Sequence, residues 1–105
     1  MVQKQIKKEK RTINKPNRYI VIDYPKENEV ITYPWYTIRI GCSENKNVEV
    51  SIDNGPWEKC RFAEGYWWFD WGNYQSGQHK IVARVRHDKG MILKKSEIRT
   101  CECRL

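Results

Sequence analysis

The stretch "VEVSIDNGPW", residues 48–57, carries the clearest fold signal in the sequence. Apolar and polar side chains alternate over residues 48–53, which is the period of a strand with one buried face. The following pair, Asn54 and Gly55, is a hairpin signal because both residue types accept positive φ angles. A return strand is then expected at residues 57–62. A β-hairpin is therefore the first element that the sequence predicts.

Working outward, similar short runs of β-branched and aromatic residues flank this hairpin on both sides. They cover residues 18–24, 36–42, 65–71, 79–87 and 91–104. Helical periodicity is absent from these runs, and turn signals recur about every 8–12 residues, as in all-β sandwiches. We therefore expect an all-β fold of about seven antiparallel strands in two packed sheets.

The net charge of +7 is concentrated at the N-terminus. Residues 1–18 contain seven basic side chains and one acidic one, whereas residues 19–105 contain 13 basic and 12 acidic ones. We therefore divide the chain into a basic tail or linker, 1–18, and a β-sandwich domain, 19–105. The basic residues of interest are Lys4, Lys7, Lys8, Lys10, Arg11 and Lys15. A solvated tail is the favoured interpretation, and binding to nucleic acid or another anionic surface is the alternative.

Several stretches resemble bacterial immunoglobulin-like domains of the early-set type. Residues 24–42 are similar to their opening strands, residues 48–57 to their "V-E-V-S-I-D-G-G-x-W" hairpin, and residues 77–86 to their "G-x-H-x-I-x-A-R" strand. Such segments occur in modules appended to extracellular glycoside hydrolases and in the dimerisation domain of sulfite-oxidase-type enzymes. The resemblance implies an immunoglobulin-like (early-set) β-sandwich that serves as a spacer, docking or dimerisation module without catalytic residues.

The aromatic run "GYWWFDW", residues 65–71, is divided by strand parity into two faces. Asp70 is seldom buried without a partner, so its face should be the outer one. The inner face then holds Trp67, Phe69 and Trp71. The outer face carries Tyr66 and Trp68, which are left for a partner or for cover by the tail or a loop.

Residues for catalysis are scarce. His79 opens a predicted strand and His87 lies in a turn, and we interpret both as ordinary surface or edge histidines. The chain has no pairing of a nucleophile with a base and no glycine-rich phosphate loop. We therefore expect a protein that is not an enzyme, with no cofactor and no metal.

The four cysteines, Cys42, Cys60, Cys101 and Cys103, allow three pairings. In an immunoglobulin-like order the first two lie at one end of the domain and the last two at the other, which argues against one zinc site. A Cys42–Cys60 disulfide and free buried thiols both remain open, and Cys101 and Cys103 can pair with a neighbouring subunit. The cellular location is unknown, and an extracellular or cell-surface one is favoured only if the cysteines are paired.

Three functions follow as hypotheses. The leading one is a non-catalytic module for protein–protein contact, assembly or domain spacing, which uses the face of Tyr66 and Trp68 and the free sheet edges. The first alternative is a carbohydrate-binding module with Trp68, Trp57 and Trp35 as stacking rings. The second is nucleic-acid or anionic-surface binding through the tail, and the tail can also add a strand to a neighbour's sheet.

No stretch is apolar over the length of a membrane span.

Overall fold

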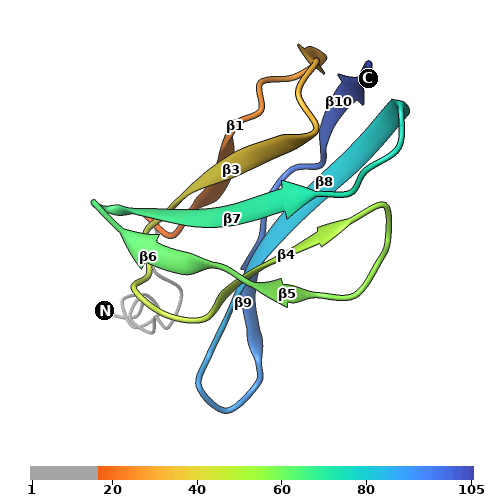
Figure 1. Cartoon of the computed structure of the whole chain (residues 1–105). Helices are drawn as coiled ribbons and strands as arrows, with labels where there is room; N and C mark the ends of the chain where they lie inside the picture. Colours follow the sequence, from red (N-terminus) through yellow and green to blue (C-terminus); the bar gives the residue numbers. More distant parts are fainter. Residues whose placement is uncertain (1–16) are drawn as a thin grey trace, which may run out of the picture.

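A computed structural model describes residues 17–105, and these residues form two β-sheets that pack face to face (Figure 1). The proposed basic residues of the tail, Lys4 to Lys15, lie outside the described residues. The ten strands are β1 (Ile20–Tyr24), β2 (Glu29–Ile31), β3 (Trp35–Cys42), β4 (Val48–Ile52), β5 (Glu58–Lys59), β6 (Arg61–Ala63), β7 (Tyr66–Gly72), β8 (Gly77–Arg86), β9 (Ile92–Lys95) and β10 (Arg99–Cys103). The all-β sandwich predicted from the sequence is confirmed.

The smaller sheet has four strands in the order β1-β3-β7-β6. The larger sheet has the order β2-β10-β8-β4-β5, with β9 paired to β8 beside β10. Every pairing is antiparallel except that of β2 with β10, which is parallel. The chain therefore contributes its first strand to the smaller sheet and its second to the larger one.

The strand count exceeds the predicted seven because two expected strands are interrupted and one was missed. The return strand at 57–62 breaks at Cys60, where the chain leaves the larger sheet as β5 and enters the smaller one as β6. The last strand breaks at Ser96, whose hydroxyl accepts the Ala83 N–H at 2.9 Å. The missed strand, β2, has only three residues, which is too short for an alternating pattern to be visible.

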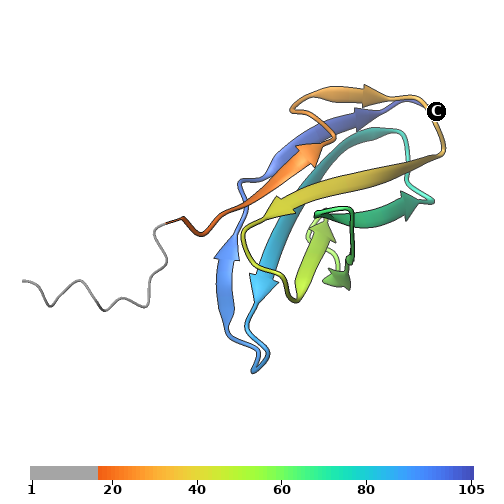
Figure 2. The ribbon, with the colours of Figure 1, turned by 90° about the vertical axis from the view of Figure 1, so that its left-hand side faces the viewer.

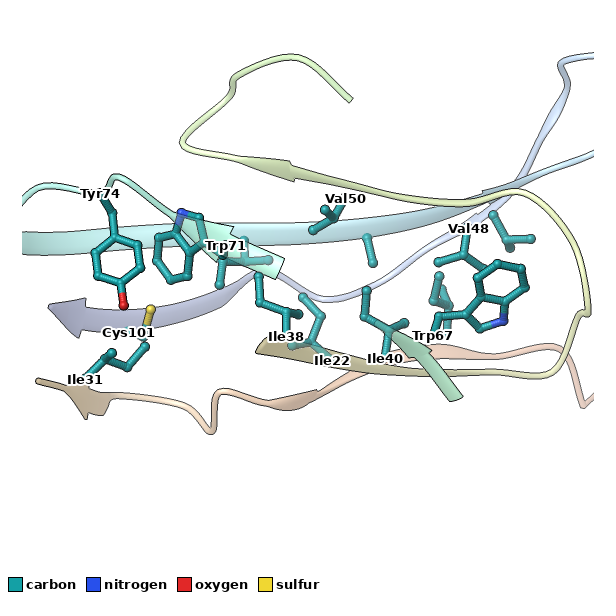
Figure 3. Close-up of a cluster of buried hydrophobic side chains, with 14 of the residues drawn as sticks. Ile22, Ile31, Ile38, Ile40, Val48, Val50, Trp67, Trp71, Tyr74 and Cys101 are labelled. Atoms are coloured by element: carbon teal, nitrogen blue, oxygen red, sulfur yellow. The ribbon is translucent and has the colours of Figure 1, made fainter. Parts of the chain in front are cut away.

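The core lies between the two sheets and is filled from both inner faces (Figure 3). Trp67 and Trp71 of β7 are buried, and Phe69 is half-buried against the same cluster. The inner face predicted for the aromatic run is thus confirmed. These rings share the core with the alternating apolar residues of β3, β4 and β8, which are Ile38, Ile40, Val48, Val50, Ile81, Ala83 and Val85.

The predicted hairpin turn is present but lies one residue earlier than expected. Positive φ angles occur at Asp53 (54°) and Asn54 (60°), and the Gly55 N–H donates to the carbonyl of Ile52 at 2.9 Å. Two central residues with positive φ fit a two-residue turn of the primed type, whose twist matches that of strands. Gly55 follows the turn instead of occupying its centre.

The sandwich has two distinct ends. The tail end is where β1 begins. At this end, Ile20 pairs with Cys42 within the smaller sheet, and Val48 pairs with Val85 within the larger sheet. The opposite end, which we call the C-terminal end, holds the last residues of β10 (Figure 2). The hairpin of β8 and β9 extends from the tail end (Figures 1 and 2).

Candidate functional site

The outer face of the smaller sheet carries Tyr66 and Trp68, as parity predicted. Both side chains are half-buried, and their rings meet edge to face at 6.1 Å between centroids. The Trp68 Nε1–H donates to the carbonyl of Ala63 at 2.8 Å, which fixes the indole over the β6–β7 hairpin. The two rings are therefore held in place before any partner arrives.

Arg39 completes this cluster from the neighbouring strand β3, where it lies opposite Trp68. Its guanidinium stacks 4.1 Å from the ring centroid of Tyr66 and 4.9 Å from that of Tyr24. Asp23 on β1 lies 3.3 Å from the Arg39 Nε. An arginine held between two aromatic rings is a cation–π arrangement, and we call the outer surface formed by Tyr24, Trp35, Arg39, Tyr66 and Trp68 the aromatic face.

Trp35 lies on the same outer side but nearer the C-terminal end. It pairs with Gly72, four positions along β3 from the Arg39–Trp68 pair, which is about 13 Å along the strand. Trp35 is 66% exposed and stacks with Tyr33, which is 68% exposed, at 6.3 Å and 30°. Sequence reasoning missed Tyr33, because an isolated tyrosine between strands carries no periodic signal.

Trp57 belongs to the other side of the molecule. The Arg84 guanidinium of β8 lies 4.0 Å from its ring centroid, so Trp57 covers the outer face of the larger sheet. Trp57 is separated from Trp35 and Trp68 by the whole thickness of the sandwich. The three rings proposed for a carbohydrate platform therefore do not form one surface.

Beneath Trp57, Glu49 binds two arginines. Its carboxylate accepts from the Arg84 Nε at 2.8 Å and from the Arg86 Nη2 at 2.9 Å, and its side chain is 9% exposed. Burial opposes ionisation of Glu49, but the hydrogen bonds from Arg86 and Arg84 outweigh it and hold the pKa of this carboxyl below its usual range. This ion-pair cluster is part of the packing of the larger sheet.

The four cysteines are free thiols in the structure. Cys42 and Cys60 lie toward the tail end, and Cys101 and Cys103 lie on β10 at the C-terminal end. The Cys42–Cys60 disulfide, which the sequence left open, is therefore not present, and no other disulfide joins two cysteines of this chain. Pairing of Cys101 or Cys103 with a neighbouring subunit stays a prediction. Burial raises the pKa of the Cys60 and Cys101 thiols to about 12, which favours the protonated thiol at neutral pH.

The interpretation of His79 as a surface or edge residue is wrong. Its ring is buried, with Nδ1 at 2.6 Å from Asp53 Oδ2 and Nε2 at 2.7 Å from the carbonyl of Gln75. Both partners offer acceptor atoms, so this arrangement favours a proton on each ring nitrogen, which is the charged imidazolium. Burial opposes this charge, but the bonds to Asp53 and Gln75 outweigh it and raise the pKa of His79.

A signal for His79 was present in the sequence. It shares strand parity with Ile81, Ala83 and Val85, so it faces the core like them. The pair of His79 and Asp53 lines a cleft of about 500 Å³ that Trp71 and Tyr74 also line. Among the described residues, no group of three or more His, Cys, Asp or Glu side chains is placed to hold a metal ion.

Comparison with known proteins identifies the fold. No family model and no curated protein matches the chain. The fibronectin(III)-like modules of Clostridium thermocellum CbhA superpose with a TM-score of 0.64 at 16% identity, over 82% of this chain and 96% of theirs. The fold is an immunoglobulin- and fibronectin(III)-like β-sandwich.

An engineered protein gives the same TM-score, 0.64, at 14% identity over 84% of this chain and 20% of its own length. At these identities the likeness is one of fold. The early-set subtype and the links to glycoside hydrolases and sulfite-oxidase-type enzymes stay predictions. Within residues 17–105, no helix is long and apolar enough to cross a membrane.

Proposed function

We propose that this chain is a non-catalytic module that makes protein–protein contacts through the aromatic face. The observation that supports this most is the Arg39 guanidinium stacked between Tyr24 and Tyr66 on an open sheet surface. Tyrosine, tryptophan and arginine are the residue types that dominate binding energies at protein interfaces. Because the rings and the guanidinium already hold one another, a partner does not have to order them on binding.

The charges on the aromatic face also favour contact with a second copy. Asp23 pairs with Arg39 at 3.3 Å, and Asp70 pairs with Arg61 at 3.2 Å. These two ion pairs are neutral, and Lys26, whose Nζ lies 5.0 Å from the Tyr24 ring centroid, adds one cation beside them. A two-fold contact between identical faces therefore brings little excess of like charge together. Val21, which is exposed on the edge strand β1, adds apolar surface to the same side.

The test is the mass of the full chain in solution, measured by light scattering over a range of concentrations with reductant present. We expect a monomer–dimer equilibrium, and Val21→Arg should shift it to monomer because it adds a charge to each facing surface. Ile98→Arg is the control, since Ile98 is also an exposed apolar residue but lies beyond β9 in the other half of the sandwich. A monomer at all concentrations, or equal effects of both variants, rejects this surface as the contact.

A second candidate function is carbohydrate binding, and the exposed Tyr33–Trp35 stack favours it. Two rings at 6.3 Å and 30° offer a broad apolar surface of the kind on which sugar rings stack. Trp35→Ala should abolish any shift of tryptophan emission that a polysaccharide causes in the full chain, whereas Trp57→Ala should not. Emission that stays constant across a panel of polysaccharides excludes this function.

A further inference from the structure

The described part of the chain is strongly polarised in charge. Residues 84–95, which contain the paired part of β8, the turn and all of β9, hold five basic side chains and one acidic one, a net charge of +4. The remaining described residues, 17–83 and 96–105, contain nine basic and eleven acidic side chains, a net charge of −2. The nearly neutral total of the domain therefore hides a basic hairpin on an acidic body.

The lysines of this hairpin are not neutralised within the domain. Lys89, Lys94 and Lys95 are exposed, and none of them forms an ion pair with another described residue. Arg84 and Arg86 share a single carboxylate, that of Glu49. The hairpin thus presents an excess of positive charge to solvent, and an anionic surface within a Debye length of it is attracted.

The tip of the hairpin is apolar as well as basic. Met91 is 68% exposed and Ile92 is 42% exposed, directly between Lys89 and Lys94. Leu93 instead packs against the core, which anchors the hairpin to the sandwich. Exposed apolar side chains flanked by lysines match the boundary between lipid headgroups and acyl chains, where both kinds of side chain find a suitable environment.

The start of the described chain lies at the same end. The N–H of Tyr19, a residue that is 52% exposed, donates a hydrogen bond to the Ser43 hydroxyl at the start of the loop that leads into β4. In the same loop, the carbonyl of Asn47 accepts the N–H of Arg86 from β8. The residues that precede position 17 are therefore attached to the end that bears the hairpin. Their sequence holds six basic side chains and one acidic one.

We propose that the tail end of this domain, with the β8–β9 hairpin at its centre, docks onto an anionic lipid bilayer surface. Lys89, Lys94 and Lys95 face the anionic headgroups, and Met91 and Ile92 enter the interface. A nucleic acid is the weaker match, because single strands are bound by exposed aromatic stacking rings and the hairpin tip has none. This surface is separate from the aromatic face, so the proposal does not depend on the protein-contact function.

The experiment is sedimentation of the full chain with vesicles of phosphatidylcholine and phosphatidylserine at about three to one, compared with phosphatidylcholine alone. We expect binding only to the mixed vesicles and weaker binding as salt is raised. Each lysine near such a surface contributes roughly a fivefold factor in affinity, so Lys94→Gln with Lys95→Gln should weaken binding by roughly twentyfold or more.

The matched control is Lys26→Gln with Arg104→Gln, which removes the same charge from exposed positions outside the hairpin. It should change binding by less than about threefold, because these groups lie beyond the reach of the headgroup potential. Equal losses for the two double variants, or no binding to mixed vesicles, overturns the proposal.

A second variant separates lipid from nucleic acid. Met91→Ser with Ile92→Ser keeps every charge and should weaken vesicle binding severalfold by removing apolar insertion. It should leave untouched any weak binding to a single-stranded oligonucleotide, which depends on charge. An oligonucleotide bound more tightly than the mixed vesicles, with no effect of this variant on either, overturns the lipid proposal in favour of a nucleic acid.

Discussion

On the outer face of each sheet an arginine stacks on aromatic side chains, Arg39 on Tyr24 and Tyr66 and Arg84 on Trp57. The two arginines differ in the carboxylates with which they pair. Arg39 pairs with Asp23, and the two side chains are 29% and 24% exposed. Arg84 pairs with Glu49, whose side chain is only 9% exposed and which also binds Arg86. The arginine–aromatic contact therefore leaves its side chains open to solvent on the smaller sheet, where Asp23 is partly exposed. On the larger sheet it is part of the packing between strands, because Glu49 is buried.

The largest effect on stability should come from breaking the buried cluster. Glu49→Gln leaves Arg84 without its charged partner and should lower the free energy of unfolding by about 2 kcal/mol, because hydrogen bonds between charged, buried groups are the strong ones. Urea denaturation at neutral pH measures it. Glu102→Gln is the control, since its pair with Arg104 is mostly solvated and should contribute little to stability.

The same cluster predicts a pH dependence. The folded-state pKa of Glu49 is lowered, so its contribution to stability is present above the unfolded pKa of about 4.3 and is lost as pH falls through the folded pKa. Glu49→Gln should therefore lose less stability between neutral pH and acid than the wild type does. Parallel acid-unfolding curves for the two proteins would contradict this assignment.

An intermediate effect is expected at His79, where the cation is the titrating partner. Its folded-state pKa is raised, so its contribution is fully present below about pH 6.5 and is lost as pH rises through the folded pKa. Asp53→Asn should cost about 1 kcal/mol at pH 6 and flatten the loss of stability at higher pH. Thermal unfolding between pH 5 and 9 measures both, and an unchanged pH profile would show that Asp53 does not set the charge of His79.

The smallest effect on stability should come from the aromatic face. Asp23→Asn should change the free energy of unfolding by less than about 0.5 kcal/mol, since its partner Arg39 remains stacked on Tyr24 and Tyr66. It should nevertheless weaken self-association, because it leaves an uncompensated cation on each facing surface. A loss of stability as large as that of Glu49→Gln would show that this face, too, is packing.

The sequence was informative wherever a periodic pattern met a buried face. Strand parity correctly separated Trp67 and Trp71 from Tyr66 and Trp68. In a strand with one buried face, successive side chains must alternate between the core and the outer face. Parity did not reveal that Trp57 lies across the sandwich from Trp68. The position of Trp57 depends on which sheet each half of the 57–62 segment joins. The alternation of polar and apolar residues is the same whichever sheet a strand joins, so it does not decide this.

The polar interior was the harder part to predict. His79 looked like a strand-edge residue although its parity was that of Ile81, because a charged ring is unfavourable in a core unless acceptors are supplied. The acceptors come from Asp53 and Gln75, at positions 26 and four residues away. The turn shifted by one residue for a related reason, since Asp53 at its centre also accepts the Lys80 N–H.

The parallel pairing of β2 with β10 has a mechanical consequence. β2 belongs to the start of the domain and β10 to its end, and three residue pairs from Glu29–Cys101 to Ile31–Cys103 join them. A pull that separates the two ends of the domain acts along these strands in opposite directions. The hydrogen bonds between them then carry the load together in shear, and none of them can open alone as in a peeled hairpin.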